Sequence, residues 1–127
     1  MTLQPIAVAP VMGLLAATVP AGFPLTAGTP TIITWTPPAD GKMHRVFAIL
    51  NLTAAAMTGG QVNVNFTDLA GNAQSRELVA AGSDSTGFAT VFAPGYFLVE
   101  GGQPVSVVQA SGVSAGTATA WAELWGS

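Results

Sequence analysis

Charged residues are scarce in this chain. Asp, Glu, Lys and Arg make up 7% of its 127 residues, against about a quarter in an ordinary soluble domain. The first charged side chain is Asp40, and residues 1–39 contain no histidine either. Because the centres of protein interfaces are depleted in charge, we expect this opening segment to lie against other protein.

The chain also lacks cysteine and has few basic residues. Without cysteine there is no disulfide framework, and cysteine usage says nothing about the cellular compartment. Three Lys and Arg residues against six Asp and Glu residues give a net charge of −3. Nucleic-acid backbones require a basic surface, and Lys42, His44 and Arg45, with Asp40 beside them, do not make one. We therefore expect no nucleic-acid partner.

Groups for catalysis or metal binding are equally few. Residues 112–116 match the G-x-S-x-G pattern of hydrolases, which requires a helix after the serine and a histidine further downstream. Here a predicted strand follows Ser114, and the single histidine, His44, lies upstream. One histidine without cysteine falls short of the usual zinc ligand sets. The six carboxylates are scattered and have few charged neighbours to tune their pKa. We expect no enzyme activity, no catalytic residue, no metal and no cofactor.

Proline is concentrated at the start of the chain, where seven of the nine prolines fall within the first 39 residues. Pro10, Pro20 and Pro24 divide the apolar stretch 6–25 into pieces too short for a membrane-spanning helix. No basic stretch precedes it, as one would in a signal peptide. We expect no membrane contact and an extended, proline-rich N-terminal arm over residues 1–30.

The apolar side chains of this arm need cover. Burying one aliphatic side chain is worth roughly 1.5–3 kcal/mol, whereas fixing the backbone costs roughly 1–2 kcal/mol per residue. Since its own domain would at best balance that cost, we expect neighbouring subunits to hold the arm. We also expect the domain to stay folded without residues 2–28. The arm residues predicted to contact partners are Ile6, Val8, Val11, Met12, Leu14, Leu15, Phe23 and Leu25.

From residue 31 onward the pattern is that of β structure. Val62, Val64 and Phe66 alternate with polar residues, as in a half-buried strand, and turn-forming residues separate the apolar runs. We expect strands over 31–36, 43–53, 61–67, 74–80, 87–92, 96–100, 105–110 and 117–125. Only 54–57 could hold a short helical turn. The chain is therefore predicted to be all-β, with one antiparallel β-sandwich or jelly roll of about eight strands in residues 31–127.

The tryptophans are candidates for contact with a partner. Trp121 and Trp125 are spaced to share one face of the last predicted strand. That face should be buried in the core or against another subunit. We name Trp35, Trp121 and Trp125 as possible interface aromatics.

Five features of the β region follow one another along the chain. A Pro38–Gly41 turn leads into the apolar strand 45–51, and a Gly59-Gly60 step leads into 62–68. A Gly-Asn turn and a Ser/Thr/Gly stretch follow, and then Val99–Val107. This combination, over about three quarters of the chain, resembles small structural proteins of tailed-phage virions, of the head decoration or tail-fibre type. The resemblance implies a jelly-roll or sandwich domain.

The resemblance further implies a capsid decoration, or cement, protein. Such a protein would bind the phage head surface and neighbouring subunits through its N-terminal arm and apolar β faces. Its partners would be the major capsid protein or another virion protein, and further copies of itself, with a trimer as the expected number. It would be made in the host cytoplasm and lie on the outside of the particle. The alternatives are a tail, fibre or other minor virion protein, or a carbohydrate- or receptor-binding β module.

Overall fold

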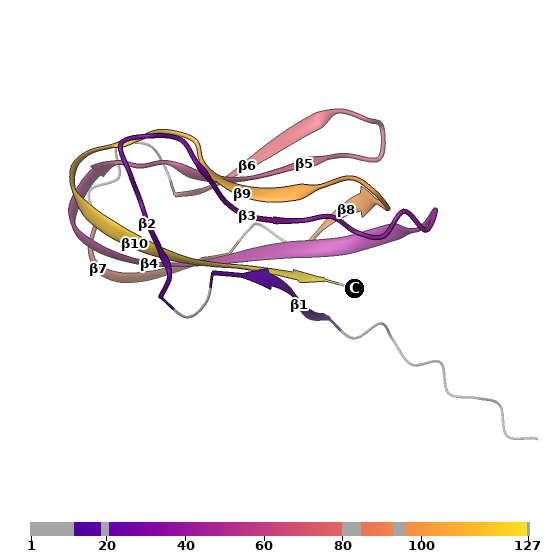
Figure 1. The fold of residues 1–127 in the computed structure, drawn as a ribbon, viewed down its shortest axis with the longest axis horizontal. Coiled ribbons are helices and arrows are strands. Elements are labelled where there is room, and N and C mark those ends of the chain that lie inside the picture. Colours follow the sequence, from indigo (N-terminus) through magenta and orange to yellow (C-terminus); the bar gives the residue numbers. More distant parts are fainter. Residues whose placement is uncertain (1–11, 19–20, 80–84, 93–95, 127) are drawn as a thin grey trace, which may run out of the picture.

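The computed structural model describes residues 12–18, 21–79, 85–92 and 96–126, without the side chains of 53–57, 79 and 85–92. Within these residues there are ten β-strands and no helix, so the all-β prediction is confirmed (Figure 1). The strands are β1 (Gly13–Ala17), β2 (Phe23–Pro24), β3 (Thr31–Trp35), β4 (Met43–Gly59), β5 (Val62–Thr67), β6 (Ala73–Val79), β7 (Ser85–Phe92), β8 (Phe97–Glu100), β9 (Val105–Gln109) and β10 (Val113–Gly126). The eight predicted strands correspond to β3–β10.

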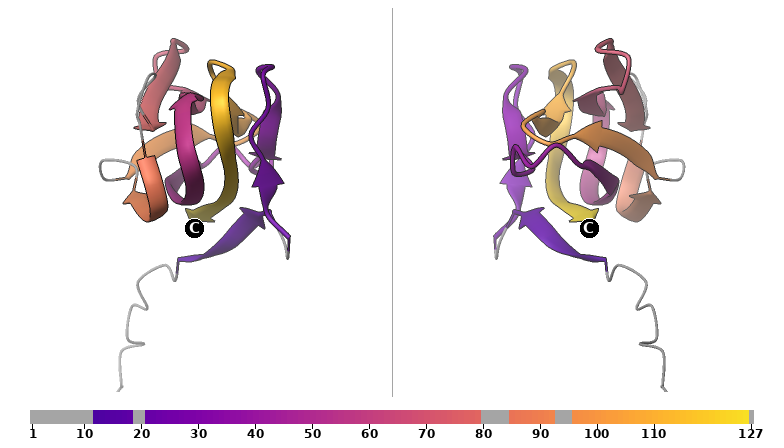
Figure 2. Two further views of the ribbon diagram at one scale, coloured as in Figure 1. Left: turned by 90° about the vertical axis from the view of Figure 1, so that its left-hand side faces the viewer. Right: turned by 90° about the vertical axis from the view of Figure 1, so that its right-hand side faces the viewer.

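The strands form two antiparallel sheets that pack face to face. Sheet A has the order β1-β10-β4-β7, with β2 also pairing with β10 and β8 with β4. Sheet B has the order β3-β9-β5-β6. Figures 1 and 2 show the sheets as two layers, with β4 and β10 in one and β5 and β9 in the other. The predicted β-sandwich is therefore present.

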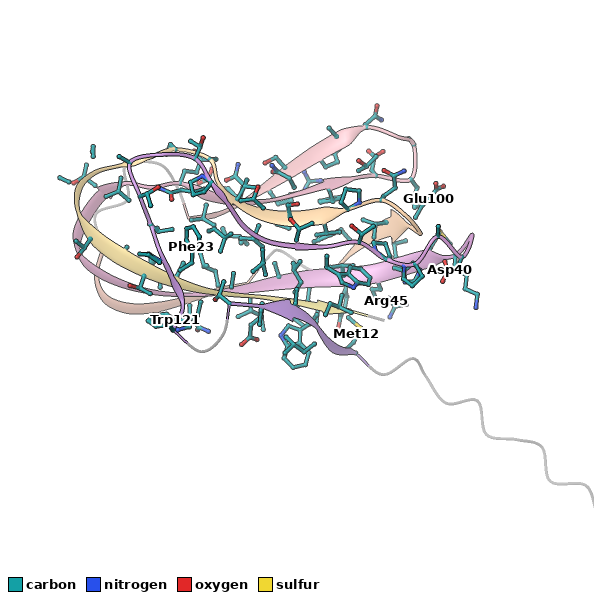
Figure 3. The ribbon with its side chains drawn as sticks, in the orientation of Figure 1. Met12, Phe23, Asp40, Arg45, Glu100 and Trp121 are labelled. Atoms are coloured by element: carbon teal, nitrogen blue, oxygen red, sulfur yellow. The ribbon has the colours of Figure 1, made fainter. Side chains whose placement is uncertain are left out.

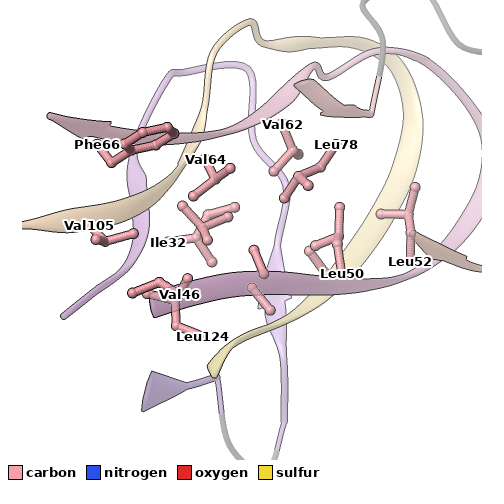
Figure 4. Packing of buried hydrophobic residues seen from close by; sticks show 14 of the residues in the cluster. Ile32, Val46, Leu50, Leu52, Val62, Val64, Phe66, Leu78, Val105 and Leu124 are labelled. Atoms are coloured by element: carbon pink, nitrogen blue, oxygen red, sulfur yellow. The ribbon is translucent and has the colours of Figure 1, made fainter. Parts of the chain in front are cut away.

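The core lies between the two sheets and consists of inward-facing side chains from both of them (Figure 4). On β5 and β9 the buried residues alternate strictly with half-exposed ones, as expected for strands with one face in a core. Sheet A contributes Val46, Ala48, Leu50, Leu52, Val99, Ala118, Ala120, Ala122 and Leu124, and sheet B contributes Ile32, Val62, Val64, Phe66, Leu78, Val105 and Val107.

β4 and β10 are the longest strands and form the spine of sheet A. They pair continuously from Val46↔Gly126 to Thr117↔Ala55, and their shared end bends toward sheet B (Figure 1). Register shifts between Val113 and Thr117 accompany the bend, because β-bulges let a strand change direction. The helical turn considered for 54–57 is wrong, since β4 continues through these residues to Gly59.

Part of the predicted arm belongs to sheet A. β1 pairs with the end of β10, with Gly13 opposite Gly126. β2 pairs with β10 further along, with Phe23 opposite Ala120. Backbone hydrogen bonds from Thr18 N to Ala122 O (3.0 Å) and from Leu25 N to Ala118 O (2.9 Å) extend this pairing. The division of the chain at residue 30 stays a prediction, but residues 13–17 and 23–25 are joined to the domain.

Gln109 attaches the segment after β2 to sheet B. Its side chain is 1% exposed. The amide nitrogen Nε2 donates to Thr26 O (2.6 Å) and to Ser111 O (3.1 Å), and Oε1 accepts from Thr26 N (3.1 Å). The backbone N–H of Gln109 also donates to Pro30 O (2.9 Å). The side chain of Gln109 thus holds residue 26 and its backbone N–H holds residue 30, so one residue fixes both ends of the segment 26–30.

Candidate functional site

The outer face of sheet A is largely apolar. Alternation along β4 directs Val46, Ala48 and Leu50 into the core and the residues between them outward. The same alternation on β10 buries Leu124 and turns Trp125 outward. We call the outward set the apolar face. It comprises Leu14, Met43, Phe47, Ile49, Tyr96, Leu98, Trp121 and Trp125.

One aromatic row crosses the middle of the apolar face. Leu14 on β1 lies opposite Trp125 on β10, and Trp125 lies opposite Phe47 on β4. The ring of Tyr96 meets that of Phe47 edge-to-face, with centroids 5.4 Å apart. Large aromatic side chains of this kind dominate the energetics of protein interfaces.

The apolar face is unusually exposed. Five large apolar side chains are recorded as exposed in the described residues, and four of them lie here: Leu14 (53%), Met43 (63%), Tyr96 (58%) and Leu98 (41%). The fifth, Leu69, lies in the β5–β6 turn. A contiguous patch of this kind marks a surface that contacts another macromolecule, whereas singly scattered apolar residues need no explanation.

Two charged residues flank the aromatic row on opposite sides. Arg45 lies opposite Leu98, two residues before Phe47, and its guanidinium lies 5.6 Å from the Tyr96 ring centroid. Glu123 lies opposite Ile49, two residues after Phe47 on β4. Its Oε2 accepts a hydrogen bond from Trp125 Nε1 (2.7 Å). Figure 3 shows Arg45 and Trp121 on sheet A, with Phe23 between the two sheets.

The outer face of sheet B is polar. Thr34 Oγ1 and Ser106 Oγ lie 2.9 Å apart on β3 and β9. On β6, Ser75 Oγ donates to Asn65 Oδ1 on β5 (2.7 Å) and accepts from Asn63 Nδ2 (2.9 Å). The two outer faces of the sandwich therefore differ: sheet B carries hydrogen-bonding groups suited to water, and sheet A carries apolar ones.

A cleft of about 370 Å³ opens on sheet B. It is lined by Asn65, Phe66, Thr67, Ala73, Gln74, Ser75, Pro104 and Ser106. The hydrogen bonds of Asn65, Ser75 and Ser106 described above occupy polar groups of this lining, and Gln74 Nε2 donates to Asp68 Oδ2 (2.8 Å). Its polar groups are thus largely engaged with one another.

His44 and Asp40 form a pair at the start of β4. Both Asp40 carboxylate oxygens lie 3.1 Å from His44 Nε2. The Trp35 ring meets the imidazole edge-on, with centroids 6.0 Å apart. The hydrogen bond with His44, helped by the backbone N–H of Lys42, lowers the pKa of Asp40. This pair lies at a turn, and no cluster of three or more His, Cys, Asp or Glu that could hold a metal ion occurs in the described part of the chain.

The predicted arm residues have different environments. Ile6, Val8 and Val11 lie outside the described residues, and Met12 directly precedes β1 with a half-buried side chain. Leu14 is the exposed member and belongs to the apolar face. The structure places three others against the domain's own core: Leu15, Phe23 and Leu25. The reason is that β1 and β2 pair with β10, which turns these side chains inward.

The tryptophans divide between the two sides of the sandwich. Trp35 packs against the core and His44, so it is not on the apolar face. Trp121 and Trp125 share the outer face of β10, as their spacing predicted, and both are half-buried. Gly22 lies close to the Trp121 ring, so the loop before β2 covers part of that side chain.

Sequence reasoning missed most of the apolar face, including Met43, Phe47, Tyr96 and Leu98. A signal was present in β4, where the residues 46–50 are apolar on both faces of the strand. Such a run is typical of a strand covered on both sides. None of the described segments forms a helix of the length and apolarity needed to cross a membrane.

Comparisons with known proteins show similarity in fold alone. No family model matches the sequence, and no curated protein matches it either. A chain in the structure of infectious bursal disease virus, Gt strain, is 16% identical, with a TM-score of 0.52 over 99% of this chain and 36% of that one. A chain in the structure of the Gx strain is 12% identical, with a TM-score of 0.49 over 98% of this chain and 36% of that one. This chain thus spans 36% of the length of each and, at 16% identity, shares a fold with the Gt-strain chain.

Proposed function

We propose that this chain is a non-enzymatic structural protein of a virus particle, and specifically a decoration protein on a phage head. The observation that carries the proposal is the contrast between the two outer faces of the sandwich. A free-standing domain would expose polar groups on both. An apolar face on sheet A and a polar one on sheet B suit a subunit with protein on one side and water on the other.

Two further features support this function. The fold is shared with a chain in a virus structure; because one fold can host many functions, this likeness counts only together with the contrast between the two outer faces. The low charge, 7% of residues, leaves few groups that would have to be desolvated when the chain is packed among other subunits. Sheet B would then form the solvent-facing side of the particle.

The proposal assigns the contacts to two parts of the chain. The uncharged residues 1–11, which contain Ile6, Val8 and Val11, attach to the major capsid protein or another virion protein. The apolar face contacts neighbouring subunits. The resemblance described above implies a homo-oligomer of three copies on the particle exterior, assembled after synthesis in the host cytoplasm.

Particle binding tests this function. Particles purified by density gradient from the virus or culture that encodes the chain should contain it by mass spectrometry. Labelled recombinant chain should cosediment with particles stripped of it. A variant lacking residues 2–11 should bind at least about tenfold more weakly, whereas Asn63→Ala on the polar face should bind normally. Absence from purified particles would overturn the proposal.

A carbohydrate-binding module is the second candidate, and the cleft on sheet B is the observation that favours it. Its lining offers neutral amide and hydroxyl groups of the kind that bind sugars. Since these groups already hydrogen-bond one another, a ligand would have to displace those bonds. Specific glycan-array binding that is lost in Asn65→Ala would support this candidate.

A further inference from the structure

We propose that the apolar face is covered by a second copy of this chain, related to the first by a two-fold axis along the aromatic row. This inference rests on the proposed function only in taking the chain to be a subunit, and it names the subunit that the face contacts. The occupant follows from the order of side chains on the face.

The register of sheet A places the outward residues in five successive rows. The central row contains Leu14, Trp125 and Phe47. On one side come Arg45 with Leu98, and then Met43 with Glu100. On the other side come Ile49 with Glu123, and then Asn51 with Trp121. The central row is thus flanked by a row with a cation and a leucine on one side and a row with an anion and an isoleucine on the other.

This order is self-complementary under a two-fold rotation. Suppose that the apolar faces of two copies meet with the two-fold axis along the central row. Each row on the Arg45 side of one copy then lies over the row at the same distance from the centre on the Glu123 side of the other copy. Arg45 of each copy then lies over the row that holds Glu123 of the other, and Met43 lies over the row that holds Trp121. An interface of this type uses the same patch on both subunits. A single face must therefore carry both the positive and the negative charge of each pair that forms across the interface.

The available charges fit that requirement. Asp40–His44 is the single ion pair recorded among the described residues, so neither Arg45 nor Glu123 is engaged in one. Arg45 is exposed and already held over Tyr96, and Glu123 is held by Trp125 Nε1. Both charges are therefore positioned before the second copy binds, which lowers the entropy lost on association.

The centre of the contact is aromatic. Phe47, Trp125 and Tyr96 lie along the proposed axis, and the exposed side chains of Leu14 and Leu98 lie beside them. Buried aromatic anchors near the middle of an interface supply most of its binding energy. The two-fold pattern favours two copies over the three that the phage resemblance implies.

The experiment is sedimentation equilibrium of the full chain over a range of concentrations. The wild type should be a dimer, and Leu98→Glu should be a monomer. Leu69→Glu is the matched control, because it places the same charge at an equally exposed leucine outside the face, and it should remain dimeric. The circular dichroism spectrum of each variant should match that of the wild type. If the Leu98→Glu protein is unfolded, Tyr96→Lys takes its place, and we expect that variant to be a folded monomer.

A charge exchange tests the two-fold arrangement itself. Arg45→Glu and Glu123→Arg should each raise the dimer dissociation constant at least about tenfold, because each places like charges together. The double variant should restore it to within about threefold of the wild type.

A monomeric or trimeric wild type, or a dimer unaffected by Leu98→Glu and Arg45→Glu, would overturn the inference. Particle binding is measured separately. A dimer absent from particles would leave this inference standing and reject the proposed function, and a particle-bound monomer would do the reverse.

Discussion

At the level of single residues, Gln109 has the clearest structural role. Its buried amide hydrogen-bonds to both backbone groups of Thr26 and to Ser111 O. Gln109→Met keeps a similar volume but removes the partner of Thr26 N–H and of Ser111 O, whereas Thr26 O keeps its hydrogen bond from Val113 N (2.8 Å). Each buried backbone group left without a partner costs about 1–3 kcal/mol. We expect urea unfolding to show at least that loss. Gln103→Met, at a half-buried glutamine with no hydrogen bond from its side chain to described residues, should change stability by less than about 0.5 kcal/mol.

Asp68 makes stability depend on pH. Its Oδ1 accepts from the backbone N–H groups of Asn72 (2.8 Å) and Ala70 (3.0 Å), and its Oδ2 accepts from Gln74. The Asn72 N–H, followed by Gln74, lowers the pKa of Asp68 below its ordinary value of 3.8. Because the folded-state pKa is the lower one, the stabilisation is complete above about pH 5, well above the unfolded pKa, and is lost as pH falls through the folded pKa.

We therefore expect the free energy of unfolding of the wild type to fall between about pH 5 and pH 2.5, and to fall less in Asp68→Asn. Urea titrations of both proteins at each pH measure this, and the difference between the two proteins isolates Asp68 from the other carboxylates. Equal slopes for the two proteins would contradict the role assigned to it.

At the level of elements, β1 and β2 determine whether the start of the chain can be removed. Deleting residues 2–28 removes both strands and Leu25, which is 8% exposed in the core. It also exposes the edge of β10. We now expect this deletion to lower stability by roughly 3 kcal/mol or more, since Leu15, Phe23 and Leu25 each contribute roughly 1.5–3 kcal/mol when fully buried.

The matched control is deletion of residues 2–11, which leaves every described strand in place and should shift the thermal midpoint by only a few degrees. Calorimetry of both variants measures the difference. Equal midpoints for the two deletions would show that β1 and β2 contribute little.

The same two strands show what sequence could and could not predict. β5 and β9 were predictable because alternation along a strand depends only on its own residues. β1 reads GLLAA without alternation, and β2 has two residues, one of them proline. Their partner β10 is more than ninety residues away, and local periodicity carries no information about it. The apolar face escaped prediction for the same reason: spacing placed Trp121 and Trp125 together, but only the sheet places Phe47 and Tyr96 beside them.

At the level of the whole molecule, the small number of charges should govern solubility. Three basic and six acidic residues give a net charge of −3 and a sequence pI of about 4.6. Proteins associate most readily when their net charge approaches zero. We expect turbidity at fixed concentration to peak near pH 4.6, and to peak less in Leu98→Glu, which removes apolar surface as well as adding charge. Turbidity independent of pH would contradict this expectation.

The pairing of β1 and β2 with β10 also fixes when the chain can complete its fold during synthesis. Ala122 N donates to Thr18 Oγ1 across 104 residues (3.1 Å), so β1 and β2 leave the ribosome long before their partner β10 does. Until β10 appears, Leu15, Phe23 and Leu25 have no sheet edge to join. Contacts over such sequence distances form slowly. Sheet A can therefore close only after β10 has emerged from the ribosome, and the apolar side chains of β1 and β2 stay without their sheet partner until then.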